Sequence, residues 1–252
     1  MKEGAITNIR RAQAHVWTLS VEPNDDAETL KMKGLLSADE VNRFDKIAHG
    51  RNRREYIAAH ALTRVMLSSF CNISPADWRF EAGKHGRPEL AGQFIHTGLR
   101  FNLSHAKNMV ACAVTVEDDI GVDVEWVDRP NDFRAIAEKK FSLPEVDYFA
   151  NAPEEDQRKV FFSFWTLKES YIKAIGKGLA EPLDGFAFNL DPLAISFLRD
   201  NGEAECWAFD LFGASPVHFC AISVARPAGV PVEIFRRSLN WHDLAAIAPP
   251  PS

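Results

Sequence analysis

Apolar and polar positions follow a helical period early in the chain and then an extended period, and the same order occurs a second time. Ser37 followed by Glu40 has the form of a capping box, which predicts a helix through about Ile47, and apolar residues at helical spacing predict a longer helix over residues 51–70. Short β-branched or alternating runs separated by Gly, Asn and Asp then predict strands at residues 78–81, 99–102, 109–116 and 120–126.

The helical period returns between residues 132 and 175, where Pro144 opens one helix and a longer helix stops at Gly176. Three further runs, GFAFNL, CWAFDLF and HFCAISVA, are typical of strands. This order predicts an α+β fold of two similar lobes. We expect an N-terminal lobe over residues 1–118, a C-terminal lobe over residues 119–244 and a flexible Ala/Pro-rich tail over residues 245–252.

Composition narrows the protein class. The chain has 252 residues, 46% hydrophobic and 25% charged, which is ordinary for a globular protein that needs no disulfide or structural metal to hold its core. Its longest apolar run, residues 109–114, is far shorter than the about 20 residues of a membrane span, and the N-terminal residues lack the apolar segment of a signal peptide. We therefore expect a cytoplasmic protein that is not in the membrane, with its four cysteines as reduced thiols. The net charge of −6 argues against a surface devoted to nucleic acid.

Two carboxylates lie on one predicted strand, in the run GVDVEW. A period of two places Gly121, Asp123 and Glu125 on one face of this strand, and Val122 and Val124 on the other. The acids are either the solvated end of an exposed strand or part of an oxygen-rich site of the kind that magnesium selects.

The last predicted helix before Gly176 carries a polar stripe. Trp165, Glu169 and Lys173 are spaced four residues apart and share one face. The stripe is either an ordinary Glu–Lys pair beside a half-buried Trp or a source of a third carboxylate for magnesium and a point charge for phosphate.

Basic and polar residues also gather at predicted turns and in the early helices. Asn102, Ser104 and His105 lie where a strand meets a turn, and Lys84 and Arg87 lie in the turn GKHGRPEL. Both segments are either ordinary polar surface or anion contacts. The early helices carry a third group of cations, which suits either a solvated face or a ligand with several phosphates: Arg43, Lys46, Arg51, Arg53, Arg54 and Arg64.

The conjunction of these segments resembles the 4'-phosphopantetheinyl transferases, of the large monomeric type that activates carrier proteins of peptide, polyketide and fatty-acid synthesis. The motifs are FNLSH at 101–105, GVDVE at 121–125 and WTLKESYIKAIGKGL at 165–179, with GKHGRP at 83–88 as a weaker fourth. The resemblance runs from about Arg51 to Leu183. It implies two similar α+β lobes related by a pseudo-twofold, with coenzyme A and a divalent cation, Mg²⁺ or alternatively Mn²⁺, bound between them.

The resemblance also implies a reaction and its residues. The 4'-phosphopantetheine group of coenzyme A, the co-substrate, is transferred to a serine of an apo acyl or peptidyl carrier protein, and adenosine 3',5'-bisphosphate is released. Asp123, Glu125 and Glu169 match the family's metal ligands, and Lys173 matches a lysine that contacts the pyrophosphate. The positions that match coenzyme A contacts, besides Lys173, are Arg51, Lys84, Arg87, Asn102, Ser104 and His105.

Three further expectations concern mechanism and partners. Glu169 is the candidate base that takes the serine proton. The segment from Phe141 to Phe149 is expected to form part of a groove for the acidic carrier. A single chain is expected to be active as a monomer, because its two lobes form the site unaided.

Two other classes of protein share some of these features. A metal-dependent nuclease also uses Asp-x-Glu on a strand, but its common form has a lysine two residues after the glutamate, and here Trp126 and Val127 follow Glu125. A non-enzymatic coenzyme A or nucleotide-binding module would keep the basic residues without needing all three carboxylates.

Overall fold

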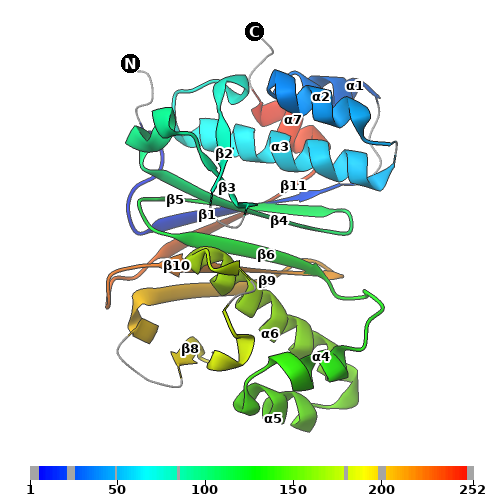
Figure 1. Cartoon of the computed structure of the whole chain (residues 1–252), viewed down its shortest axis with the longest axis vertical. Coiled ribbons are helices and arrows are strands. Elements are labelled where there is room, and N and C mark those ends of the chain that lie inside the picture. The colour runs from blue at the N-terminus through cyan, green and yellow to red at the C-terminus, as the bar shows by residue number, and fades with distance from the viewer. Residues whose placement is uncertain are drawn as a thin grey trace.

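Two β-sheets pack face to face, and each is covered on its outer side by helices (Figure 1). The computed structural model describes residues 6–21, 26–48, 50–83, 86–178, 181–197 and 203–248. The facing side chains of the sheets are small or branched apolar residues from β1, β5, β6 and β10, and they form a core between the sheets. The fold is α+β, with one of the two larger sheets and its helices in each half of the molecule.

The first sheet has the strand order β11-β1-β5-β4, and β5 pairs antiparallel with both β1 and β4. Helix α3 covers its outer face, with α1, α2 and α7 beside it (Figure 1). The elements before the midpoint are β1 (Gln13–Ser20), α1 (Asp26–Lys33), α2 (Ala38–Lys46), α3 (Arg51–Phe70), η1 (Pro75–Asp77), β2 (Phe80–Ala82), β3 (Pro88–Leu90), η3 (Gly92–Thr97), β4 (Leu99–Ala106) and β5 (Met109–Val116).

The second sheet has the order β6-β10-β9, and α6 crosses its outer face with α4 and α5 against the far end of α6 (Figure 1). A separate hairpin, β7-β8, lies on the same side. The elements are β6 (Ile120–Trp126), α4 (Phe133–Lys140), α5 (Leu143–Asn151), α6 (Glu154–Ile175), η5 (Leu183–Gly185), β7 (Phe186–Leu190), β8 (Leu193–Phe197), η6 (Glu203–Cys206), β9 (Trp207–Ser215) and β10 (His218–Ala225).

The last strand and helix return to the first half. Strand β11 (Glu233–Leu239) pairs in parallel with β1, and α7 (Trp241–Ile247) packs into the core of the first half, where Ala245 and Ala248 are buried. This corrects the predicted organisation, which assigned residues up to 244 to the second lobe and residues 245–252 to a tail. Residues 249–252 lie outside the described residues, and the boundary at 118–119 stays a prediction.

Local signals in the sequence located most elements well. The capping box of Ser37 and Glu40 forms at the start of α2, and α3 has the predicted bounds. The strand expected at 78–81 begins only at Phe80, because Trp78 turns into the core. None of the four cysteines, all of which lie in the described part of the chain, forms a disulfide. Within the residues that the structure describes, we find no helix with the length and apolar character of a membrane span.

Candidate active site

Strand β6 and helix α6 touch at Gly121. A Cβ atom here would lie 2.0 Å from the carbonyl oxygen of Ser170 and 2.4 Å from the amide nitrogen of Ala174, so only glycine allows this approach. Because Asp123 and Glu125 share the face of Gly121, their side chains also lie on the α6 side. The valines between them pack into the core between the sheets, which confirms the predicted division of the strand.

The polar stripe of α6 lies over this acidic face. Trp165 Nε1 donates a hydrogen bond of 2.8 Å to Glu125 Oε1. Lys173 Nζ donates to Asp123 Oδ1 at 2.7 Å and to Ser104 Oγ at 2.8 Å. Asp123 is only 5% exposed, so the alternative of a solvated strand end is wrong for this residue.

The carboxyl groups of the site influence one another. Burial, and then the charge of Asp123, raise the pKa of Glu169, while Lys173 and Arg129 lower it. Burial, and then Asp123, also raise the pKa of Glu125, to about 7, although Arg129 Nη1 lies 3.1 Å from Glu125 Oε2. These repulsions would be relieved by a cation among the three carboxylates.

One oxygen of this cluster has no partner. Asp123 Oδ2 is buried without a hydrogen bond, whereas Oδ1 pairs with Lys173. As they stand, no three His, Cys, Asp or Glu side chains in the described part of the chain are close enough together to hold a metal ion. Asp123, Glu125 and Glu169 are thus brought to one region without forming a coordination shell. Their oxygen chemistry and the unpaired oxygen fit a hard divalent cation.

A pocket of about 520 Å³ opens beside the carboxylates and contains most of the expected anion contacts. Ser104 and His105 enter it from the end of β4, and Arg51 enters it from the start of α3. The complete lining is Arg51, Leu103, Ser104, His105, Ala106, Lys107, Asp123, Val124, Glu125, Trp126, Arg129 and Lys173. Cations from the first half therefore face acids from the second.

Two described residues among the expected contacts, Asn102 and Arg87, do not line this pocket. Asn102 is 6% exposed, and its side-chain oxygen accepts the backbone N–H of Val122 at 2.9 Å, so it joins β4 to β6. The guanidinium of Arg87 instead binds the backbone carbonyl groups of Lys173, Phe101 and Ile120. Lys84 lies outside the described residues.

Sequence reasoning missed two features of the pocket. Arg129 forms its ion pair with Glu125, and Lys107 Nζ lies 3.6 Å from the ring centroid of Trp126. The only signals in the sequence were the spacing of four residues between Glu125 and Arg129 and the position of Lys107 at a predicted turn. Neither signal distinguishes a pocket residue from polar surface.

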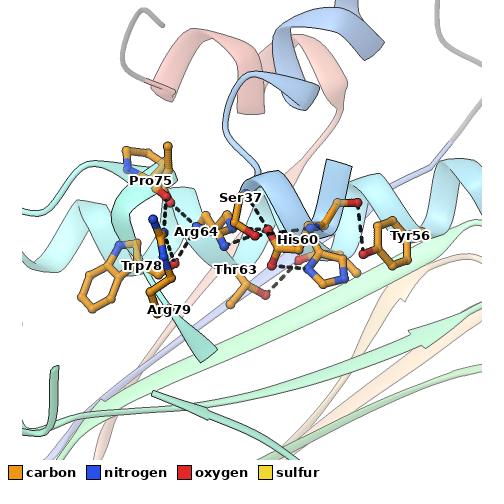
Figure 2. A network of polar contacts seen from close by, with 11 residues as sticks. Ser37, Tyr56, His60, Thr63, Arg64, Pro75, Trp78 and Arg79 are labelled. Atoms are coloured by element: carbon orange, nitrogen blue, oxygen red, sulfur yellow. Dashed lines mark hydrogen bonds and ion pairs between the residues drawn. The ribbon is translucent and has the colours of Figure 1, made fainter. Parts of the chain in front are cut away.

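A second cavity, of about 350 Å³, lies against α2, α3 and residues 79–82, 86 and 88, and shares Leu103 with the first pocket. Beside it, Glu40 accepts a bond of 2.8 Å from Arg64 Nε and lies 2.9 Å from His60 Nδ1. Arg64 Nη1 also donates to the carbonyl oxygens of Pro75 and Trp78 (Figure 2). Arg64 is 1% exposed, and its guanidinium is bound within this network. It therefore neither lies on a solvated face nor contacts phosphate, the two alternatives considered for the cations of the N-terminal helices.

The charge state of Glu40 is strongly biased by this network. Burial raises the pKa of Glu40, but the hydrogen bond with His60 and the charge of Arg64 outweigh it and lower the pKa to about 2. The carboxylate therefore stays ionised and holds α2 against α3.

Comparison with known proteins agrees with the motifs. Residues 119–222 match the model of the 4'-phosphopantetheinyl transferase superfamily. The 4'-phosphopantetheinyl transferase HetI of Nostoc sp. is 31% identical over 214 residues, which cover 84% of this chain and 87% of the relative. The 4'-phosphopantetheinyl transferase ffp of Bacillus subtilis is 29% identical over 206 residues, or 81% and 89% of the two chains.

A solved structure, that of Thermotoga maritima holo-(acyl-carrier-protein) synthase, matches with a TM-score of 0.37 and 22% identity over 43% of this chain and 62% of that chain. The sequence identity to HetI extends over both halves of the fold and beyond the segment that the superfamily model matches. Because of this sequence identity to HetI, the chain belongs to the 4'-phosphopantetheinyl transferase superfamily.

Proposed function

We propose that this transferase moves the 4'-phosphopantetheine group of coenzyme A to a serine hydroxyl of an apo acyl or peptidyl carrier protein. The observation that carries the proposal is the pocket in which Asp123, Glu125 and Lys173 face Arg51 and His105. Such a pocket suits a pyrophosphate ester, because its cations attract the phosphates and its carboxylates accept the counter-cation. Adenosine 3',5'-bisphosphate is the leaving group.

Asp123, Glu125 and Glu169 are the residues that would hold Mg²⁺, with Mn²⁺ as the alternative. The unpaired Oδ2 of Asp123 and the raised pKa values of both glutamates support this assignment. When bound, the cation would supply positive charge to the pyrophosphate oxygens during transfer.

The chain's own residues account for the remaining chemistry. Glu169 accepts the proton of the carrier serine. The serine oxygen forms a bond to the β-phosphorus, and the bond from that phosphorus to the bridging oxygen of the bisphosphate breaks. The ammonium of Lys173 offsets the negative charge that develops on the leaving group.

The second cavity is where we propose that the nucleoside end of coenzyme A binds. It adjoins the first pocket at Leu103, and Phe80 and Phe101 in its lining offer apolar surface to a base. Arg51, Ser104 and His105 then lie on the phosphate side.

We propose that the carrier protein docks on the exposed face of α5, and not on the whole segment from Phe141 to Phe149. Phe141 is 4% exposed and stacks on Phe161, so it belongs to the core and an exchange for Asp would test folding instead of docking. Leu143 and Tyr148 are exposed on α5, at 80% and 51%. Lys140, at the end of α4, is close enough to lower the pKa of Glu169, and such a cation near the site suits an acidic carrier.

Intact-mass spectrometry of an apo carrier protein, incubated with this protein, coenzyme A and magnesium, tests the reaction. We expect a gain of one phosphopantetheine mass that is lost in Asp123→Ala and retained in the control Asp156→Ala, an acid on the surface of α6. Tight binding of coenzyme A without a mass gain on several unrelated carriers would instead support the non-enzymatic binding module. Near-normal turnover of Glu169→Gln would contradict its role as the base.

A further inference from the structure

Arg87 connects three elements that are far apart in the sequence. It lies just before β3, and its guanidinium donates from Nη1 to the carbonyl oxygen of Lys173 at 2.5 Å. Its Nη2 donates to the carbonyl oxygens of Phe101 and Ile120, each at 3.0 Å. These three carbonyl groups belong to α6, β4 and β6, so one side chain joins the helix to both sheets.

The contact with Lys173 lies in the last turn of α6. The final carbonyl groups of a helix have no partner within it, and a cation there also interacts favourably with the helix dipole. In this turn the carbonyl oxygen of Ile172 accepts the N–H of Gly176, while that of Lys173 accepts from Arg87. Arg87 thus caps α6 from another part of the chain.

The same residue, Lys173, carries the ammonium group of the pocket. Its side chain reaches Asp123 and Ser104 while its backbone is held by Arg87. Gly121 leaves no free space between β6 and α6, so the helix cannot approach further. The steric contact and the hydrogen bonds of Arg87 together determine where α6 lies along β6.

We propose that Arg87 is a positioning residue, which holds the end of α6 so that the Lys173 ammonium points at the reacting phosphates. The expected effect of Arg87 on catalysis rests on the proposed function, whereas its hydrogen bonds with the backbone do not. The positioning role replaces the expectation that Arg87 contacts coenzyme A, because Nη1 and Nη2 both donate to backbone carbonyl groups. A shift of about 1 Å at a charged group in an active site is enough to slow catalysis strongly.

Three variants test this role. Arg87→Met removes every donor and keeps an unbranched apolar side chain, Arg87→Lys restores the charge with a single ammonium, and Arg100→Met removes a neighbouring exposed arginine on β4 as the control. We expect Arg87→Met to lower kcat about tenfold and to change the KM for coenzyme A less than about threefold. Arg87→Lys should recover part of kcat, and Arg100→Met should match the parent protein.

A double-mutant cycle with Lys173→Met separates positioning from a direct contact. If Arg87 acts through Lys173, then Arg87→Met causes no further loss of kcat in the Lys173→Met background. Independent losses that multiply would overturn the proposal. So would a rise in the KM for coenzyme A with kcat unchanged, which is the result expected of a direct contact.

Hydrogen–deuterium exchange of the ligand-free protein tests the contacts without any substrate. Arg87→Met should lose about tenfold protection in peptides covering residues 170–178 and none in peptides of α3. Unchanged exchange at residues 170–178 would overturn the proposal, and if Arg87→Met does not fold, the same comparison is made with Arg87→Lys. A parent protein that transfers no phosphopantetheine yet shows the exchange effect would refute the proposed function and leave the role of Arg87 in holding α6 intact.

Discussion

A buried ion pair between Lys168 and Glu145 should contribute strongly to the stability of the second half. Both side chains are 0% exposed, and Lys168 Nζ lies 2.7 Å from Glu145 Oε2. Lys168 also donates to the carbonyl oxygens of Leu183 and Phe186, each at 2.7 Å, so its three donors are all used. The pair joins α6 to the start of α5 and to the entry of β7.

The carboxylate of Glu145 is equally well satisfied. Oε2 accepts from the backbone N–H of Ser142 at 3.0 Å and from its hydroxyl at 2.6 Å, and Oε1 accepts from the N–H of Phe188 at 2.9 Å. Lys168→Met would leave this negative charge buried without an opposite charge beside it. Breaking a buried pair in this way costs about 3–5 kcal/mol, a large part of the about 5–15 kcal/mol that holds a typical domain folded.

Urea unfolding followed by circular dichroism measures this loss. Lys177→Met is the matched control, because Lys177 forms an exposed pair with Glu181 and its loss should cost at most about 1 kcal/mol. The double variant Lys168→Met with Glu145→Gln should regain about 1–2 kcal/mol, because the amide carries no charge and keeps an acceptor. A loss below about 1 kcal/mol in Lys168→Met, or a double variant less stable than the single one, would refute the reasoning.

Three further predictions concern substitutions at Gly121, Glu40 and Asn102. Gly121→Ala should displace α6 from β6 and cost about 1–3 kcal/mol in urea unfolding, with transfer activity reduced as well, and an unchanged midpoint would contradict the close approach. His60 and Arg64 lower the pKa of Glu40 to about 2, so the ionised carboxylate stabilises the folded state by about 3 kcal/mol at pH values above its ordinary pKa of about 4.5. This stabilisation should be lost as the pH falls from 4.5 to 2. Urea midpoints compared at pH 5 and pH 3 should therefore depend less on pH in Glu40→Gln than in the parent protein. Asn102→Ala should lower the free energy of unfolding by about 1–3 kcal/mol, because the buried backbone N–H of Val122 loses its acceptor. In calorimetry, the affinity of the folded variant for coenzyme A should equal that of the parent protein, and a weaker affinity would indicate a direct contact.

Much of the candidate site was accessible from the sequence because its residues follow local periods. The strand period placed Asp123 and Glu125 on one face, and the helix period placed Trp165, Glu169 and Lys173 on one stripe. The contacts of Trp165 and Lys173 with the two acids bring the strand face and the helix stripe together. Periodicity alone left open whether the two elements meet, and the resemblance to a family supplied that expectation.

Other features depend on partners that are distant in the chain. The separation between Arg87 and Lys173 is 86 residues, and Glu145 lies 23 residues before its partner Lys168. The sequence around each of these residues is equally compatible with exposed charge. Only the packing of α6 against its neighbours decides which groups lose water and therefore need a partner.

The amino-acid sequence by itself determined the α+β class, the start of α2 and the span of α3, because caps, glycines and apolar spacing act within a few residues. The tertiary structure alone decided that β11 returns to pair with β1, at a separation of 220 residues, and that α7 covers the first core. It also decided that the side chains of Arg87 and Asn102 form hydrogen bonds with backbone groups of β6. Hydrogen bonds and burial between such remote segments arise only when the whole chain is folded, so no local pattern contains them.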